Sequence, residues 1–399
     1  MTRPFRPALH VASSDAAVPR HAPLTYSMLS TYPPTACGLA TFTASLAGEL
    51  GGAIGQERGC RVVRVVDTVD DSPAEVVADL VAGSTASRQR ATAALNDADV
   101  AIVQHEYGIF GGPDGDEVLD VLKALTVPVI VVLHTVLLEP TANQRAVLEA
   151  VVDMADAVVT MTHTARRRLD AGYVVDMTKV WVIPHGAHVA PGLDASVARD
   201  DRPTILTWGL IGPGKGIEWG IEALALLRDL RPRPRYLIVG KTHPKVLDAH
   251  GETYRNGLKS RAAELGVSAE VEFDATYLDV PALQRIVSQA SLVLLPYDSP
   301  DQITSGVLIE AVAAGKPVIS TQFPHAVELL GGGVGLLVGH RDPLAMASAI
   351  RRVLTDAALR TSMTDAAERL APALAWPAVA DGYRNVAVQL IARRATAVA

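Results

Sequence analysis

The chain has 399 residues, of which 49% are apolar and 20% are charged, and its formal net charge is −7. This length exceeds what a single hydrophobic core usually serves, so two domains are expected, and the acidic balance gives no electrostatic reason to expect a nucleic-acid partner. Cys37 and Cys60 are too few for a disulfide framework, which favours a reducing compartment.

Residues 1–23 are rich in proline, alanine, serine and histidine, and this composition predicts a flexible tail. They contain no apolar run of signal-peptide length, and no run elsewhere reaches membrane-spanning length. We therefore expect a cytoplasmic protein without a transmembrane segment. A peripheral contact with the inner face of the membrane is compatible with that expectation.

Short apolar runs alternate with helical patterns through the first half of the chain, which predicts a parallel sheet with helical crossovers. In such a sheet, ligands gather at the carboxyl ends of the strands. The expected segments are a strand from Leu24, a turn at Gly38 with a helix after it, a strand from Arg61, a long helical region from Ala74 to Leu95, and strands from Val100 and Pro128.

Polar side chains follow two of these strands. His105, Glu106 and Tyr107 follow one strand, and His134 ends the next. The His-Glu pair does not continue into the HExxH motif of zinc proteases, because position 109 is isoleucine. Residues 105–107 can form a ligand-facing loop or a capped strand end, and the pattern leaves both readings open. A single histidine after a strand is more often structural than catalytic.

The sequence PHGAH contains His185 and His188, but no third ligand of suitable spacing accompanies them, so a metal site is not indicated. The following residues, 189–203, are loop-like and form the predicted boundary between the two domains.

The second half repeats the order of strand, loop and helix from Thr204 onward. Residues from Gly209 to Lys215 nearly match the GxxxxGK phosphate loop, but the next residue is Gly216, so the serine or threonine that would hold magnesium is missing. Lys215 is then either a phosphate-binding lysine or a solvated loop lysine, and the glycines around it favour the first reading.

The most informative stretch is 298–321, DSPDQITSGVLIEAVAAGKPVIST. Ser305 is a good N-cap, a helix-permissive run follows Gly306, and Gly315 ends the helix before a β-branched strand. A helix start exposes N–H groups and the positive end of the peptide dipole, which suits a phosphate. Glu310 lies inside the apolar run and needs a partner, because burial of an isolated charge is costly, and ribose hydroxyls would serve.

Taken in order, these motifs resemble retaining glycosyltransferases of family four, which have the GT-B fold of two Rossmann-like doubly wound α/β domains facing a cleft. The resemblance rests on YPP…CGLATF, ADAVVTMTHTARRRL, VWVIPHGAH, the glycine loop before Lys215, and QITSGVLIEAVAAGKPVIST. Two positions depart from the family pattern. Gln302 replaces the first Glu of the Glu-x7-Glu motif, as in a subset of the family, and Leu210 replaces an arginine of the glycine loop.

The resemblance implies a role for each candidate residue. Glu310 would hold the ribose, Lys215 would neutralise the diphosphate, and His134 would contact the sugar; these are the three catalytic candidates. The other donor-binding residues implied are Gly38, Gly212, Lys241, Tyr277, Gln302, Thr304, Ser305, Gly306, Val307 and Leu308. On the acceptor side, the implied residues are His105, Glu106 and Tyr107.

The implied reaction moves a hexose from a nucleoside diphosphate sugar, of the GDP-mannose or UDP-glucose type, to a hydroxyl group with retention of configuration. The acceptor would be a small molecule, a glycan or a lipid-linked molecule. Neither a metal nor a cofactor is implied, since the sugar nucleotide is a co-substrate. Asp97 and Asp99 match the Asp-x-Asp pattern of metal-dependent glycosyltransferases of the other main fold, but they precede a strand, away from the ligand edge.

Two alternatives stay open. One is a non-catalytic or decayed protein that binds a sugar nucleotide, which Leu210 and Gln302 favour, and the other is a GT-B epimerase or phosphorylase. The expected division is a tail at 1–23, an acceptor domain at 24–190, a nucleotide-sugar domain at 191–375, and a helix at 376–399 that crosses back to the first domain.

Overall fold

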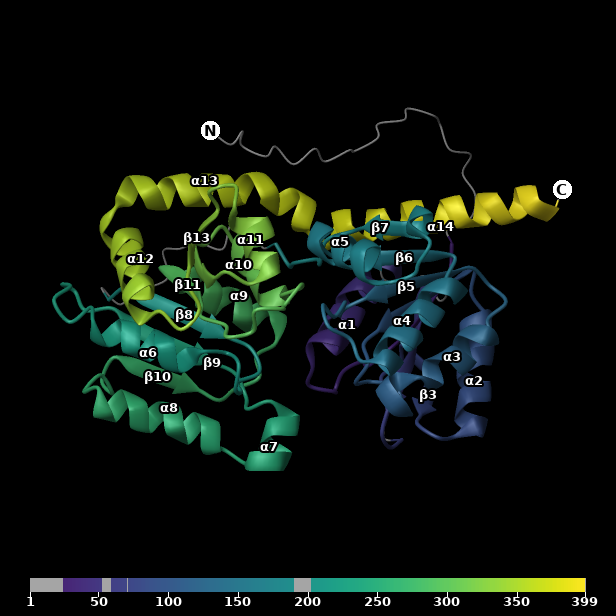
Figure 1. Ribbon diagram of the computed structural model, residues 1–399, viewed down its shortest axis with the longest axis horizontal. Helices are drawn as coiled ribbons and strands as arrows, with labels where there is room; N and C mark the ends of the chain where they lie inside the picture. Colours follow the sequence, from purple (N-terminus) through teal and green to yellow (C-terminus); the bar gives the residue numbers. More distant parts are fainter. Residues whose placement is uncertain (1–23, 52–58, 70, 190–201, 399) are drawn as a thin grey trace.

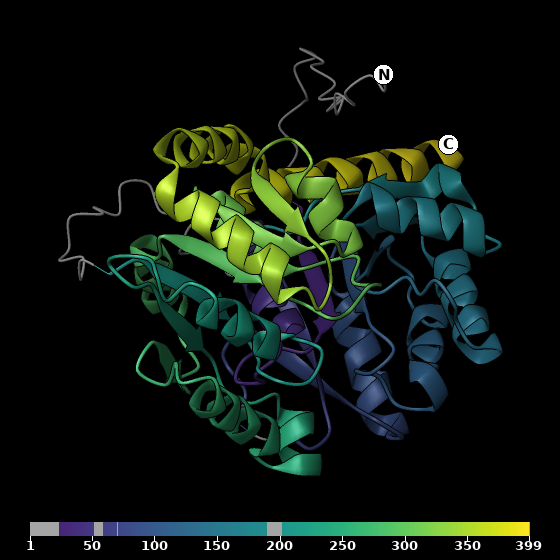
Figure 2. The ribbon, with the colours of Figure 1, turned by 60° about the vertical axis from the view of Figure 1, so that its left-hand side comes forward.

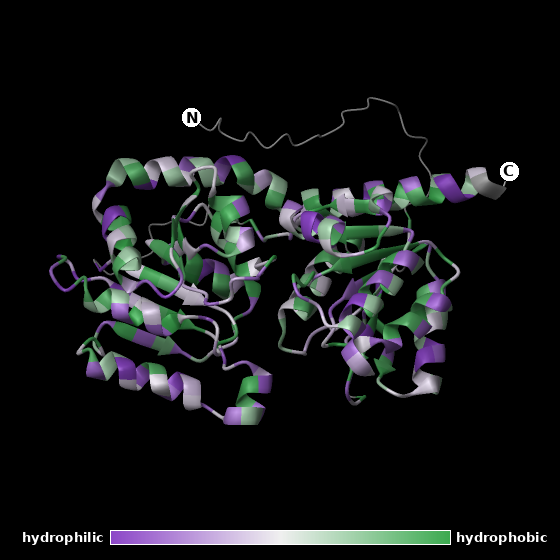
Figure 3. Ribbon diagram, in the orientation of Figure 1, coloured by the Kyte–Doolittle hydropathy of each residue, from purple (hydrophilic) through white to green (hydrophobic). Residues whose placement is uncertain are grey.

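The computed structural model describes residues 24–51, 59–69, 71–189 and 202–398, which form two α/β lobes side by side (Figure 1). The tail expected at 1–23 and most of the boundary loop expected at 189–203 lie outside the described residues. Apolar residues concentrate on the strands inside each lobe, and polar residues concentrate on the outer faces of the helices (Figure 3). Each sheet is therefore covered on both faces, as parallel sheets require.

The amino lobe is built on a seven-stranded parallel sheet with the order β3-β2-β1-β4-β5-β6-β7. Its strands are β1 (Tyr26–Ser30), β2 (Cys60–Val66), β3 (Val76–Val81), β4 (Val100–His105), β5 (Val129–Leu133), β6 (Ala157–Thr160) and β7 (Val180–Val182). Its helices are α1 (Gly38–Gly51), α2 (Thr85–Asn96), α3 (Glu117–Lys123), α4 (Ala142–Met154) and α5 (His163–Gly172), with 3-10 turns at Pro113–Gly115 and Met177–Lys179.

The expectation of a long helical region from Ala74 to Leu95 is wrong. Its first part is the edge strand β3, which pairs in parallel with β2, and only α2 is helical. A turn at Gly83, with φ +71°, separates the two elements, and Ser84 caps α2 by accepting a hydrogen bond from the N–H of Ser87. Pairing with β2 thus outweighs the local helical pattern of the run EVVADLV.

The carboxyl lobe has a six-stranded parallel sheet with the order β10-β9-β8-β11-β12-β13. Its strands are β8 (Thr204–Trp208), β9 (Arg235–Val239), β10 (Val271–Asp274), β11 (Leu292–Leu295), β12 (Val318–Thr321) and β13 (Gly335–Val338). Its helices are α6 (Ile217–Ala225), α7 (Pro244–His250), α8 (Thr253–Glu264), α9 (Val280–Gln289), α10 (Gly306–Ala313), α11 (Pro324–Leu330), α12 (Pro343–Thr355) and α13 (Ala357–Leu374). Figure 2 shows α6 and α12 in front of this sheet, where they share one apolar cluster with its strands.

The last helix, α14 (Trp376–Val398), leaves the carboxyl lobe and runs along the amino lobe (Figure 1). Ala375 has an extended backbone, and Pro377 follows at the start of α14, so α13 and α14 do not fuse into one helix. Trp376 and Tyr383 are buried in the same apolar cluster as Phe42 of α1. Among the described residues, no helix is both long and apolar enough to cross a membrane.

Candidate active site

The start of α10 exposes two backbone amides. Ser305 is the N-cap, as predicted, because its Oγ accepts a hydrogen bond from the N–H of Leu308 at 3.2 Å. The N–H of Ser305 donates to Nδ1 of the buried His325 at 2.9 Å. The N–H groups of Gly306 and Val307 have no acceptor among the described residues. These two amides and the helix dipole form an arrangement that can bind an anion.

His185, from the segment after β7, lies against Gly306. A Cβ atom added to Gly306 would stand 2.9 Å from Nε2 of His185, so a larger residue would force one of them to move. Nδ1 of His185 is 2.7 Å from the Gly186 carbonyl and therefore donates to it, which leaves Nε2 as the bare nitrogen of the neutral ring. Burial lowers the pKa of His185. The ring meets Phe42 of α1 edge to face at 5.0 Å.

The glycine loop after β8 lies beside the start of α10, because β8 and β11 are neighbours in the sheet. A Cβ atom added to Gly209, whose φ is +117°, would be 3.6 Å from Cγ2 of Val307. In the same loop, Nζ of Lys215 lies 4.4 Å from the ring centroid of Tyr297 and is half-buried. Leu210 is also half-buried and brings no charge to the loop. Lys215 is thus a cation of this loop, and its ammonium group lies over the ring of Tyr297, which follows β11.

A second group of cations follows β9, in the sequence KTHPK. Burial lowers the pKa of His243, and the positive charges of Lys245 and Lys215 lower it further. Nζ of Lys245 lies 3.5 Å from the place of a Cβ on Gly108, across the boundary between the lobes. Lys241 is exposed. Sequence reasoning singled out Lys241 and missed the other two, although basic residues repeated after a strand were a usable signal.

Glu310 has a protein partner that the sequence did not reveal. Its carboxylate oxygens accept hydrogen bonds from the backbone N–H of His188 at 3.4 and 3.3 Å, and Oε1 lies 3.3 Å from Nδ1 of the same histidine. The carbonyl of His188 accepts a hydrogen bond from Nε2 of Gln284 on α9 at 3.2 Å. Glu310 is half-buried, and these long contacts leave lone pairs of the carboxylate available to a ligand.

The residues expected to face the sugar have internal partners. Nε2 of Gln302 donates to the Thr304 carbonyl at 3.0 Å, and Oγ1 of Thr304 is buried without a partner among the described residues. Nε2 of His134 lies 2.6 Å from Oε1 of Gln104. Burial, aided by the nearby His185 and His105, lowers the pKa of His134 to about 3. His134 is therefore a neutral imidazole at ordinary pH.

Of the three acceptor-side candidates at 105–107, two turn inward, and His105 is the last residue of β4 and not part of the loop after it. His105 is fully buried, its two ring nitrogens have no partner in the part of the chain that the structure describes, and burial lowers its pKa to about 4. Tyr107 is 9% exposed, and its hydroxyl donates to the Gln144 carbonyl of α4 at 3.2 Å. Glu106 is half-buried and accepts a 2.5 Å hydrogen bond from Thr135. Burial raises the pKa of Glu106, while that bond and the charge of Lys245 oppose the rise.

Three more donor-side candidates lie near the boundary between the lobes. Tyr277 is 42% exposed, and its hydroxyl lies 3.3 Å from Oγ1 of Thr41 on α1. Gly38 begins α1, and a Cβ atom there would meet nothing within 4 Å. A Cβ atom on Gly212 would be 3.2 Å from Cγ2 of Val246. The side chain of Leu308 is fully buried, so Leu308 takes part only through its backbone.

The acidic pair considered for a metal is used structurally. Asp97 is the C-cap of α2 and forms an exposed ion pair with Arg61 at 2.6 Å. Oδ2 of Asp99 accepts from the N–H and the hydroxyl of Thr25, both at 2.8 Å. Within the described ranges, no group of three or more His, Cys, Asp or Glu side chains could hold a metal ion. Metal independence stays a prediction.

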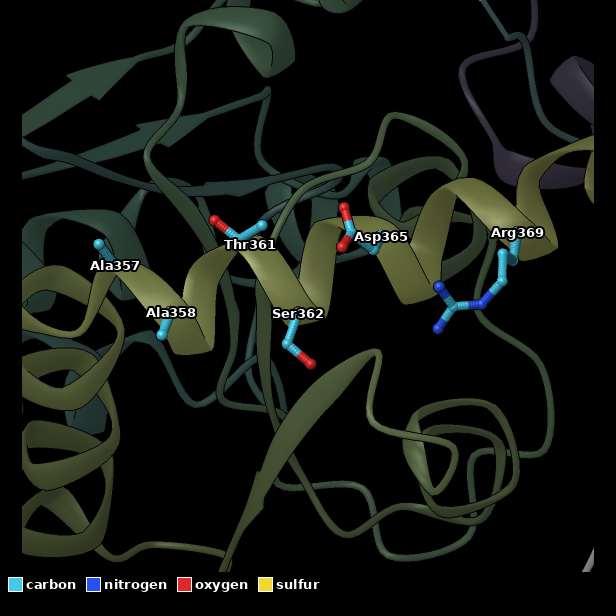
Figure 4. Close-up of a pocket in the computed structure, with 6 residues that line it drawn as sticks. All are labelled: Ala357, Ala358, Thr361, Ser362, Asp365 and Arg369. Carbon is cyan, nitrogen blue, oxygen red and sulfur yellow. The ribbon is translucent and has the colours of Figure 1, made fainter.

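A hollow of about 490 Å³ lies elsewhere, along α13 (Figure 4). All of its lining residues come from that one helix, and they are Ala357, Ala358, Thr361, Ser362, Asp365 and Arg369. It contains none of the candidate residues. A wide hollow along a single helix brings no groups together from different elements, so it carries no argument for chemistry.

Sequence comparison finds relatives for the carboxyl lobe and for part of the whole chain. Residues 193–370 match the sequence model of the family described as Glycosyl transferases group 1. The D-inositol 3-phosphate glycosyltransferase of Corynebacterium jeikeium is 29% identical over 265 residues, which are 62% of this chain and 61% of that protein. Its namesake from Acidothermus cellulolyticus is 29% identical over 272 residues, 65% of this chain and 59% of the relative. The chain thus spans about three fifths of the length of these curated relatives.

Solved structures show the same architecture. The Anabaena protein HepE in complex with UDP and glucose superposes with a TM-score of 0.71 at 17% identity, over 92% of this chain and all of that one. Sucrose-phosphate synthase from Thermosynechococcus elongatus gives a TM-score of 0.71 at 20% identity, again over 92% of this chain and 100% of its own. Identities this low concern the fold alone.

The predicted fold class is confirmed: the protein has the GT-B fold, with two parallel-sheet α/β domains. Within it, residues 193–370, which include the glycine loop and α10, are similar to the family described as Glycosyl transferases group 1. The subset with glutamine at position 302 stays a prediction.

Proposed function

We propose that this protein is a retaining glycosyltransferase that moves a hexose from a nucleoside diphosphate sugar to a hydroxyl acceptor without a metal or a cofactor. The observation that carries the proposal is the start of α10. There the amides of Gly306 and Val307, which have no acceptor within the described ranges, adjoin the loop of Lys215, and Glu310 lies one turn further along the same helix. Diphosphate and ribose are the adjoining parts of one ligand that this spacing would suit.

In this proposal the carboxyl lobe holds the donor. The two amides and Lys215 would stabilise the charge that develops on the departing diphosphate, the role of an oxyanion hole. The bond between the anomeric carbon and the phosphate oxygen breaks, a bond to the acceptor oxygen forms on the same face, and the acceptor proton passes to the departing phosphate. His134 and Gln302 would orient the sugar. Closure of the lobes would exclude water, since hydrolysis competes with transfer.

The relatives narrow the first substrates to test. The names of the curated relatives point to a phosphorylated polyol as an acceptor class, and HepE was solved with UDP and glucose. We therefore place UDP-glucose and GDP-mannose first among donors, and a cyclitol phosphate first among acceptors, before glycan and lipid-linked acceptors. We further propose that the protein works in the cytoplasm, where sugar nucleotides are made.

Thermal unfolding with UDP-, GDP- and ADP-sugars tests the donor site, because a ligand that binds only the folded state raises the melting temperature. One donor should raise it, and Glu310→Ala should abolish the rise. Glu264→Ala is the matched control, because Glu264 is exposed on α8 and pairs with Arg261. Product analysis should then show transfer with retained configuration. Isomerised donor or phosphate-dependent glycan cleavage would instead support the epimerase or phosphorylase.

The second candidate is a protein that binds a sugar nucleotide without turning it over. It is favoured by the neutral, half-buried Leu210 and by Gln302, whose amide is bonded to its own loop at Thr304. Leu210→Arg with Gln302→Glu distinguishes the two candidates. The double substitution should create transfer activity in a decayed site and should impair it in a specialised one.

A further inference from the structure

His188 joins the two lobes through its ring. Nδ1 and the backbone N–H of His188 face the carboxylate of Glu310 at 3.3 to 3.4 Å, and Nε2 lies 3.2 Å from Oγ of Ser45 on α1. A carboxylate can only accept, so Nδ1 carries the proton toward Glu310 in the neutral ring. Nε2 is then the acceptor, and the Ser45 hydroxyl donates to it. One chain of hydrogen bonds therefore runs from α1 to α10.

The backbone of His188 is held in place from two sides. Its neighbour Ala187 pairs with the junction between α13 and α14, where the Ala187 N–H donates to Leu374 at 2.8 Å and the Trp376 N–H donates to Ala187 at 3.1 Å. The His188 carbonyl accepts from Gln284 of α9. Hydrogen bonds thus hold the backbone that carries the ring at the point where the chain passes between the lobes.

The same face of α1 meets the carboxyl lobe a second time. Thr41 is four residues before Ser45, so both side chains lie on one side of the helix. Thr41 contacts the hydroxyl of Tyr277 at 3.3 Å, while Ser45 contacts His188. Figure 1 shows α1 at the edge of the amino lobe that faces the carboxyl lobe. Both contacts of this face therefore reach residues on the nucleoside side of the site.

We infer that His188 is a positioning residue that fixes the ribose-binding carboxylate of Glu310 against Ser45 of the amino lobe, so that donor binding and docking of the lobes are coupled. This inference rests on the proposed function of Glu310. Catalysis in the cleft needs groups from both lobes in register, and a hydrogen-bonded chain through the crossing segment provides one. In the absence of ligand, the same chain keeps the carboxylate from shifting away.

Three substitutions of one residue separate the two halves of the bridge. An asparagine amide reaches the place of Nδ1, so His188→Asn keeps a donor for Glu310 and loses Ser45. A glutamine amide reaches the place of Nε2, so His188→Gln keeps the contact with Ser45. His188→Ala loses both, while the backbone N–H remains in every variant. Ser45→Ala removes the far partner, and its control is Ser288→Ala, since the half-buried Ser288 hydroxyl donates to the Arg285 carbonyl of its own helix α9.

Binding is measured with UDP, GDP and ADP and with their 2′,3′-dideoxy forms, by thermal shift and calorimetry. For the nucleotide that binds, His188→Ala should weaken the ribose form about tenfold, and His188→Asn should restore most of the loss. The dideoxy form should bind all variants within about twofold, since it offers Glu310 no hydroxyls. Equal losses for both forms, or no loss, would overturn the inference while leaving the proposed function intact. If no nucleotide binds the unsubstituted protein, the proposed function fails, and the ribose role of His188 fails with it.

The bridge itself is tested without a nucleotide. Thermal unfolding of Ser45→Ala, Glu310→Gln and the double variant forms a cycle, and a non-additive result is expected because the two residues share His188. Nitrogen NMR of the His188 ring should show the proton on Nδ1 and should respond to Ser45→Ala. Additive stabilities together with an unchanged ring spectrum would show that the bridge is absent in solution, and would overturn the coupling of the lobes.

Discussion

The start of α10 follows β11, and residues 105–107 lie at the end of β4. Both regions carry polar groups, but those of α10 face outward and those of β4 face mostly inward. At α10, the amides of Gly306 and Val307 find no acceptor among the residues that the structure describes. At the end of β4, His105 is fully buried, and the hydroxyl of the nearby Tyr107 donates a hydrogen bond to α4. The comparison teaches that a strand end locates polar residues in the fold but does not decide which way their side chains face.

The difference has a physical origin in the donors themselves. A backbone amide at a helix start cannot turn into a core, because its direction is set by the helix axis. A side chain after a strand can rotate toward either side, and packing decides the outcome. The helix start at Ser305 was therefore readable in the sequence, whereas the directions of the side chains at residues 105–107 were not.

Among the predicted changes, removal of the Lys215 side chain should have the largest effect on the rate of transfer. Lys215→Ala should lower the rate of transfer by about 10²- to 10³-fold, because one of the groups that stabilise the departing diphosphate is lost. The matched control is Lys259→Ala, since Lys259 also lies over an aromatic ring, that of Phe273 on the outer side of the lobe. Steady-state kinetics with the donor found by thermal shift provides the measurement. A loss of less than threefold would remove Lys215 from the site.

A methyl group at the helix start should weaken donor binding. Gly306→Ala places a Cβ atom 2.9 Å from His185 and should lower affinity for the nucleotide at least about tenfold by moving the amides. In Gly257→Ala on α8, the new methyl group meets nothing within 4 Å, so it should stabilise the fold by about 0.5–1 kcal/mol. Calorimetric titration and thermal unfolding measure the two effects. Unchanged binding in Gly306→Ala would mean that the amides do not hold the phosphate.

Because His105 is buried, we expect the free energy of unfolding to depend on pH. The pKa of His105 is about 4 in the folded protein and about 6.5 when unfolded, so between these values only the unfolded chain binds the proton. Acidification thus favours unfolding: the stability present above pH 6.5 is lost as the pH falls toward 4. From pH 6.5 to 5, His105 alone should account for a loss of about 2 kcal/mol.

Denaturant titrations of His105→Leu at pH 7 and pH 5 check this expectation, since the variant should lose less stability between the two values. Burial lowers the pKa of His134 and of His325 to about 3. These two residues should therefore add to the loss of unfolding free energy on acidification, equally in the unsubstituted protein and in His105→Leu. His250→Leu is the control, because His250 is exposed on α7. If the unsubstituted protein and His105→Leu lost the same stability between pH 7 and pH 5, the ring of His105 would be in contact with water and not buried.

The smallest effect is expected at the opposite end of β4. Asp97→Asn breaks an exposed ion pair with Arg61 and should cost less than about 1 kcal/mol, with no change in transfer. Addition of a chelator should likewise leave transfer unchanged. Thermal unfolding and a transfer assay test both statements. A large loss of activity from either change would revive the metal-dependent reading of this acidic pair.

The sequence by itself determined features that depend on neighbours along the chain. These include the alternation that gives two parallel sheets, the N-cap at Ser305, and the break before Pro377. The prediction of one helical region over residues 74–95 was wrong, because strand pairing between β2 and β3 outweighs local helix preference.

Only the tertiary structure decided which groups meet across the lobes. Glu310 and His188 are 122 positions apart, and Lys245 reaches Gly108 from the other lobe. Such pairs depend on how two finished lobes pack together, and no periodicity, cap or turn preference encodes that packing at the residues concerned. The helix start at Ser305 is encoded locally, whereas the position of the Glu310 carboxylate against His188 is set by the fold.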